Sequence, residues 1–495
     1  MRTVSIGPGA RLALAAVLVL GCMAAPALGH DHHGGANMNF DAGEPIGGVL
    51  KAHIFLMSIA FGAVFPVGLV LGLKKNRWHV PVQATGGVMA AIGFVLGHAH
   101  GGRAFPDNAH SKFSWFMLWL LAGQLGAGVY LKLHTEKRFN DRARPFIKIA
   151  HRIMAAVMVI ATYVQILLGV VAWLGYCYDG YYGQCLAHLI MGSSFLAYGV
   201  WLLLLTRLAM PWLKRFGRSP ELYDSATIMV WGLFNTFTEH GFIDEAHGWS
   251  HKDLQHTSLG VIWFCGGLLS TYMLRRSTSS DRSMFPAIIL VFTGGAMGAH
   301  QQDSEFSTQV HFVFGLSLVV TGLARCIEIL LITTNLIRSD SSAPNPFQYI
   351  PVFFLCHSGV MFMAANKQSV AAIENMGIDI GTFSLAYLSI SFLLFLYAYF
   401  LMQLYSDLGA QAKKDTSLPT AEDNSVYHPV SQSTDHADLS PRGSDDNPRN
   451  PHVLFDAAAE GIIEHRGRDS LDGMHRYRAS ARSSDEIELG PMRSD

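Results

Sequence analysis

Histidines at the ends of apolar segments are the residues in this sequence best suited to chemistry. His53, His79, His110 and His151 begin the first, second, third and fourth long apolar stretches, respectively. If these stretches cross a membrane in alternating directions, His53 and His110 share one membrane level, and His79 and His151 share the other. Two histidines that face each other across a helical bundle can supply both axial ligands of a haem iron. The order predicts two bis-histidine haem sites, one near each membrane surface; alternatively, the four histidines only cap interfacial helices.

The elements that must position these histidines are long and apolar. Hydrophobic residues make up 50% of the 495 residues and charged residues only 15%, against about a quarter in soluble domains. Eleven apolar segments are expected at 50–73, 80–97, 112–133, 149–174, 186–208, 226–242, 257–274, 284–300, 311–335, 349–366 and 382–405. Most approach the ~20 residues that cross a bilayer, whereas 226–242 and 284–300 are short. We expect an all-α membrane protein with about 11 transmembrane helices in two helical bundles.

Charges between the segments predict the orientation. The first, third, fifth and seventh loops carry clusters such as KKNR, HTEKRFNDRARPFIK and RRSTSSDR, whereas the alternate loops hold few basic residues. Because cytosolic loops are enriched in Lys and Arg, the mature N-terminus is expected outside and the C-terminus in the cytosol. We expect a multi-pass protein of the secretory pathway, in the plasma membrane or a vacuolar or other endomembrane. The net charge of −1 excludes nucleic-acid binding through bulk electrostatics.

The chain divides into five parts by composition. Residues 1–29 resemble a cleaved signal peptide, with an uncleaved first helix as the alternative, and 30–49 form an extracytosolic His-rich segment. The two bundles are expected at 50–209 and 225–405, and a polar, disordered cytosolic tail at 406–495.

Cleavage after Gly29 would place His32 third in the mature chain, where it could enclose Cu(II) with backbone nitrogens and His30. The alternative is a flexible His-rich tail with weak, unspecific metal affinity.

Two groups of residues on the predicted outer face could also carry chemistry. Cys177 and Cys185 share one outer loop, where oxidising conditions permit a disulfide. In the second bundle, a third haem could lie between His256 and His311. A copper or zinc site fits equally well, since imidazole and carboxylate suit both metals; its candidate ligands are Glu239, His240, His256 and His300. The remaining alternative is a polar, hydrogen-bonded outer cap.

The stretch from His53 to Gly175 resembles a cytochrome b-561 transmembrane domain. The resemblance rests on HIFLMSIAFGAVFPVG, on HVPVQ, and on glutamines fourteen residues after His110 and His151, namely Gln124 and Gln165. It implies two haem b groups held by the four histidines, a cytosolic donor such as ascorbate, and an outside acceptor. The second half, with WGLFNTFTEHGF, WSHKDLQHTSLG and HSGVMFMAANKQ, resembles the C-terminal half of fungal YTP-type membrane proteins.

These expectations describe an integral membrane haem protein that carries electrons across the bilayer. The donor would be a cytosolic small molecule such as ascorbate, and the acceptor a ferric or cupric ion, as in an oxidoreductase of the ferric or cupric reductase type. The alternative is a metal-binding or metal-transporting membrane protein that uses outer-face histidines without haem. A haem-less structural descendant is a third alternative. The sequence leaves the oligomeric state open.

Overall fold

The structure is a computed structural model that describes residues 45–417 with short breaks. The breaks are residues 102, 104, 106–107, 134–137, 178–181, 216, 239–250, 277, 279–280, 301, 335 and 337–343. The expected signal peptide, the His-rich segment through residue 44 with His30 and His32, Glu239, His240, and everything beyond 417 lie outside the described residues.

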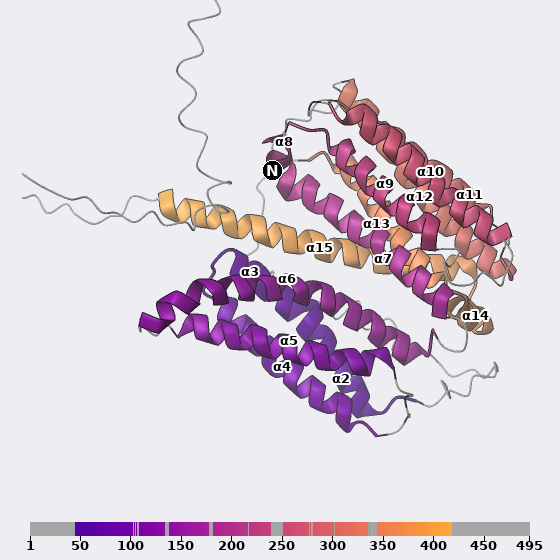
Figure 1. Cartoon of the computed structure of the whole chain (residues 1–495). Coiled ribbons are helices and arrows are strands. Elements are labelled where there is room, and N and C mark those ends of the chain that lie inside the picture. Colours follow the sequence, from indigo (N-terminus) through magenta and orange to yellow (C-terminus); the bar gives the residue numbers. More distant parts are fainter. Residues whose placement is uncertain are drawn as a thin grey trace, which may run out of the picture. The chain divides into compact units, whose positions relative to one another are not determined.

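The first half of the described chain folds into two helical hairpins (Figure 1). One contains α2 (Gly48–Ile59), the π-turn η2 (Ala60–Val64), α3 (Phe65–Leu73) and α4 (His79–Ala99). The other contains α5 (Ala109–Lys132) and α6 (Arg138–Leu174). Lys75 makes the turn before α4 at a φ of 53°, and Asn108 caps α5 by accepting from the Ser111 backbone N–H. These helix ends make His79 the first residue of α4 and His110 the second residue of α5.

The second half is a larger helical assembly. Its elements are α7 (Tyr182–Leu204), η3 (Leu205–Ala209), α8 (Met210–Arg215), α9 (Pro220–Thr238), α10 (His251–Leu274), α11 (Phe285–Gly298), α12 (Glu305–Thr333), η4 (Pro346–Gln348), α13 (Tyr349–Ala364), α14 (Lys367–Asn375) and α15 (Ile380–Ser417). Its main core cluster contains Phe195, Trp263, Phe314, Leu318 and Met361. Most of α13 is buried, so this helix lies at the centre of the second bundle.

Each of the eleven expected apolar segments coincides with a helix, and an all-α membrane protein is confirmed. Nine helices in the described part of the chain are long and apolar enough to cross a membrane. The other two, α9 and α11, are the segments that the sequence indicated as short, and α11 has only 14 residues. About 11 crossings are therefore expected only if these two short helices also span the bilayer.

The packing boundary between the bundles differs from the compositional one. The fifth segment, expected within 50–209, is α7, and its Gly192 and Gly199 lie against α13. The last helix, α15, continues past the expected end at 405 to Ser417. It buries Leu404 and Leu408 against Val67 and Leu71 of α3. The physical reason is the same in both cases: the apolar and small faces of α7 and α15 find their partners in sequence-distant helices.

Glycines bring the helices of the second bundle into close contact. The Cβ atoms that an alanine would add at Gly294 and Gly315 would each lie 2.4 Å from the other glycine's carbonyl oxygen, joining α11 to α12. Gly192 and Gly359 make the same kind of approach between α7 and α13. In a bilayer, where lipid tails are as apolar as leucine, small residues promote helix association by allowing close backbone packing.

The close approach at Gly359 can be tested by a single methyl group. In Gly359→Ala, the new Cβ would lie 2.5 Å from the Gly192 carbonyl oxygen and 2.6 Å from the Leu196 nitrogen, so the helices must separate. We expect a loss of about 1–3 kcal/mol of stability, measured by thermal or detergent-induced unfolding. The matched control is Gly295→Ala on α11, where no atom lies within 4 Å of the added Cβ. An equal loss in both variants would contradict the assigned packing.

Candidate functional site: paired histidines and a buried charge cluster

The four histidines of the first half form two pairs. The ring centroids of His53 and His110 are 6.3 Å apart with an interplanar angle of 83°. Those of His79 and His151 are 6.5 Å apart at 82°. The pairing is the one expected from the order of the segments. The Gly93 carbonyl that contacts His53 marks the level of the first pair on α4. Gly93 lies fourteen residues after His79, a separation of ~21 Å along the helix. The pairs therefore occupy opposite ends of the hairpins.

Backbone carbonyls orient three of the four imidazoles. The Nδ1 atom of His53 lies 2.7 Å from the Gly93 oxygen, that of His79 lies 2.8 Å from the Gly68 oxygen, and that of His110 lies 3.1 Å from the Gln165 oxygen. An Nδ1–H that donates to a carbonyl leaves Nε2 with its lone pair, the form in which histidine binds a metal. The His151 Nδ1 makes no hydrogen bond of standard geometry, although the Gln124 carbonyl interacts with it.

A glycine supports each histidine from the other helix of its hairpin. A Cβ at Gly97 would lie 2.6 Å from the His53 ring, and one at Gly72 would lie 2.7 Å from the His79 ring. The corresponding distances are 3.1 Å from Gly169 to His110 and 3.6 Å from Gly128 to His151. Side chains at the first two positions would displace the imidazoles, so these glycines help set the spacing of each pair.

The supporting residues repeat a spacing that the sequence interpretation missed. Each histidine faces a carbonyl at one position and a glycine four residues later, on the same helix face. The four pairs of positions are 68 and 72, 93 and 97, 124 and 128, and 165 and 169. Gln124 and Gln165, the glutamines noted in the sequence, supply two of these four carbonyls. Gln165 also donates from its side chain to the His110 carbonyl at 3.1 Å. The G-x-x-x-G and Q-x-x-x-G spacings were the signal in the sequence.

The geometry of both pairs fits an axial ligand set. A metal-bound imidazole nitrogen lies about 2 Å from the metal and about 1 Å from its own ring centre, so two opposite imidazoles have centroids roughly 6 Å apart. The observed 6.3 and 6.5 Å match this separation. Together with the glycine supports and the Nδ1 contacts, it makes these residues suitable for holding haem iron between the two hairpins.

The described histidines that the sequence places on the predicted outer face also lie in pairs, but in a new combination. His311 lies beside His188, with centroids 6.1 Å apart, and His256 lies beside His300 at 5.8 Å. The structure thus brings His256 and His300 together, as the copper or zinc hypothesis requires, and places His188 of α7 next to His311. Within the described residues, no three His, Cys, Asp or Glu side chains converge as a metal-binding group. Glu239 and His240 are not described, so their part in that hypothesis stays a prediction.

The structure contains the disulfide between Cys177 and Cys185. Cys177 adopts a positive φ of 63°, and its backbone N–H donates to the Gln368 side chain just after α14 begins. The bridge joins Cys177, which follows α6, to the first part of α7, and this hydrogen bond links Cys177 to α14. The bridge therefore lies at the same end of α7 as His188.

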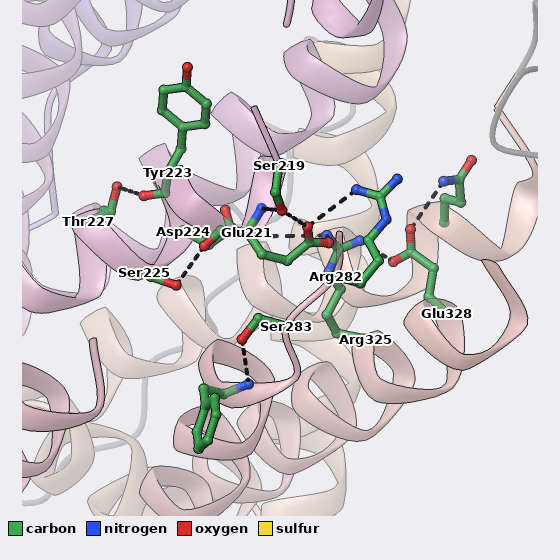
Figure 2. Close-up of polar contacts among 12 residues, drawn as sticks. Ser219, Glu221, Tyr223, Asp224, Ser225, Thr227, Arg282, Ser283, Arg325 and Glu328 are labelled. Atoms are coloured by element: carbon green, nitrogen blue, oxygen red, sulfur yellow. Dashed lines mark hydrogen bonds and ion pairs between the residues drawn. The ribbon is translucent and has the colours of Figure 1, made fainter. Parts of the chain in front are cut away.

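A cluster of charged side chains is buried at the opposite end of the second bundle. Figure 2 shows Glu221 between Ser219 and two arginines. Its carboxylate accepts from Ser219 at 2.6 Å, from Arg282 at 3.2 Å and from Arg325 at 3.0 Å. Arg325 also pairs with Glu328 at 2.6 Å, as its three-residue spacing predicts. Burial of so many charges is tolerated because each carboxylate has a cationic partner.

The fold and the paired histidines together describe a multi-pass α-helical membrane protein with polar sites inside both bundles. The family model described as "Protein YTP1-like, C-terminal" matches residues 161–406, and a model for a domain of unknown function, DUF2427, matches 35–134. The two matches leave residues 135–160 uncovered, a stretch that includes the first part of α6 with His151.

Relatives agree with these matches. Protein YTP1 of Saccharomyces cerevisiae is 34% identical over 306 residues, which are 61% of this chain and 64% of the yeast protein. An uncharacterised membrane protein of Schizosaccharomyces pombe is 24% identical over 448 residues, covering 66% of this chain and 87% of that protein. No solved structure matches. The chain is thus similar to fungal membrane proteins of the YTP1 type.

The charge cluster makes a specific prediction for Arg325. Arg325→Met would leave Glu328, which is 2% exposed, without a cationic partner, and would leave Glu221 paired with Arg282 alone. Because a buried unpaired charge is costly, we expect a loss of about 3–5 kcal/mol in the free energy of unfolding. The control is Lys367→Met, whose pair with Asp303 is more than half exposed and worth at most about 1 kcal/mol. Similar losses in the two variants would show that the cluster does not stabilise the bundle.

Proposed function

We propose that this protein carries electrons across its membrane through two haem groups held by His53 with His110 and by His79 with His151. The observation that carries the proposal is the matching geometry of the two pairs, at 6.3 Å and 83° and at 6.5 Å and 82°. The cytochrome b-561 resemblance of the same stretch supports it. Haem bound at each pair would supply a reversible one-electron iron couple whose potential depends on the ligands and their surroundings.

The protein itself would position the imidazole ligands and adjust their basicity. Carbonyls at Gly93, Gly68 and Gln165 keep three imidazoles in the ligating tautomer and increase their basicity. The hairpins keep the two pairs ~20 Å apart along α4, within the ~30 Å apolar core. Basic residues beside His79, including Lys74, Lys75 and Arg77, form a rim that would attract an anionic donor such as ascorbate.

Replacement of single histidines tests the haem assignment. We expect two haems per chain in the purified protein, with a reversible reduced-minus-oxidised absorbance change. His53→Ala or His110→Ala, and likewise His79→Ala or His151→Ala, should lower the ratio to about one, because each haem loses an axial ligand. His98→Ala is the matched control: it lies on α4, but its Nδ1 contacts the Phe94 carbonyl of its own helix at 3.0 Å. Two haems in all four variants, or no haem in the wild type, would refute the proposal.

Sealed vesicles test the direction of transfer. With the basic loops facing the medium, external ascorbate should reduce the haem absorbance, and trapped ferric or cupric ion should then be reduced. With the opposite orientation, external ascorbate should be ineffective, because the basic rim at Lys74, Lys75 and Arg77 lies in the lumen. Increasing salt should slow the reduction through screening. Equal reduction from both sides would contradict a cytosolic donor site.

The second candidate function is metal handling at the outer face. It is favoured by the His256–His300 pair, whose ring centroids are 5.8 Å apart, and by the His188–His311 pair. Imidazoles suit copper and zinc equally well, and undescribed His240 or Glu239 could complete such a site. Elemental analysis separates the two functions: copper or zinc in the purified protein without a haem spectrum supports metal handling.

A further inference from the structure

The second bundle encloses a cavity that neither proposed function uses. Its volume is about 740 Å³, and its lining residues come mainly from α7, η3, α8, α9, α10, α11, α12 and α13. Small-molecule sites typically occupy roughly 300–1,000 Å³, with apolar walls and a few converging polar groups. Three indoles, of Trp201, Trp231 and Trp263, line this cavity, and they offer flat surfaces on which a rigid ring system can pack.

The polar part of the cavity wall is the charge cluster of Figure 2. Within it, Glu221 and Glu328 use both carboxylate oxygens in hydrogen bonds to protein groups. Asp224 differs, because Tyr198 donates to Oδ1 whereas Oδ2 lies 3.9 Å from the nearest Arg325 nitrogen, beyond hydrogen-bonding distance. Asp224 keeps 13% of its side chain exposed and Arg325 26%. Asp224 Oδ2 can therefore accept from a bound molecule, and Arg325 lies close enough to contact the same group.

Charge balance indicates which head group belongs there. The lining residues Arg207, Arg282 and Arg325 carry three positive charges, and Glu221, Asp224 and Glu328 carry three negative ones, so the formal sum is zero. A cationic or anionic head group would thus add an uncompensated charge to a buried site, at a high desolvation cost. A hydroxyl is neutral, donates one hydrogen bond and accepts others, so it can bridge Asp224 and Arg325.

We propose that this cavity binds a neutral, ring-bearing lipid alcohol of the sterol type. The hydroxyl donates to Asp224 Oδ2 and accepts from Arg325, and the ring body packs against Trp231, Trp201 and Trp263. The site needs no haem and no metal, so it is independent of the proposed electron transfer.

The head group is tested on the unmodified full-length protein. Purified protein in sterol-free detergent is titrated with dehydroergosterol, a fluorescent sterol alcohol, and energy transfer from tryptophan is measured. Unlabelled sterol alcohol should displace it. The corresponding 3-ketone, which cannot donate a hydrogen bond, should compete at least tenfold more weakly, and the 3-sulfate and 3-amino analogues should not compete. Absence of transfer, or equal competition by any of the three analogues, would overturn the proposal.

Substitutions locate the binding site. Asp224→Asn replaces the Oδ2 acceptor with an amide donor at nearly constant volume, and should weaken binding at least tenfold. Its control is Glu374→Gln on exposed α14, which should bind like the wild type. Trp231→Phe should reduce energy transfer more than Trp119→Phe, because Trp119 is a 74% exposed residue of α5 in the first bundle. Unchanged affinity in a folded Asp224→Asn protein, or equal effects of the two tryptophan variants, would show that the sterol binds elsewhere.

Discussion

Polar groups inside an apolar helical protein must find their partners within the protein, and the architecture of this chain follows from that constraint. A bilayer offers no water to a buried imidazole, carboxylate or backbone amide. The imidazoles of the first bundle contact carbonyls of the neighbouring helix, as in the 2.7 Å contact between His53 and Gly93. The carboxylates of the second bundle gather around Arg325. In both bundles, polar contacts join helices that are neighbours in the fold.

Small residues make these polar contacts geometrically feasible. An imidazole ring reaches the carbonyl on the adjacent helix only if no side chain occupies the position one turn further on, and Gly97 and Gly72 meet that requirement. In the second bundle the same residue type brings backbones together directly, as at Gly192 and Gly359. Glycine therefore serves two purposes here, providing room for a ring in one bundle and close helix packing in the other.

Both α6 and α15 connect the two bundles, since Tyr163 of α6 donates to Ser193 of α7 at 2.8 Å. α15 leaves the second bundle, where its Ser391 hydroxyl lies 2.9 Å from the His357 Nδ1, and contacts α3 of the first bundle through Leu404 and Leu408. Lys74 also lies over the ring of Tyr405, at 3.8 Å from its centroid. α15 thus contacts the first bundle beside the loop that precedes His79.

The sequence by itself determined the helical class, the positions of the apolar segments and the pairing of His53 with His110 and of His79 with His151. These features depend on local hydrophobicity and on the order of segments along the chain, both of which are readable without distances. The weak segments at 226–242 and 284–300 were also recognisable, since length alone limits a crossing. The ion pair of Arg325 with Glu328 is also local, because residues three apart on a helix are neighbours.

Only the tertiary structure decided the contacts between distant segments. The sequence suggested His311 as a partner for His256. The fold instead places His311 beside His188, because α7 packs in the second bundle with α12 and α13. Nothing in the sequence marked Glu221 and Asp224 as members of a buried cluster. Acidic residues are common in the first turn of a helix, and these two precede an apolar segment. Their role depends on Arg282 and Arg325, which lie 61 and 104 residues away from Glu221. Such partners are set by helix packing, which no local pattern encodes.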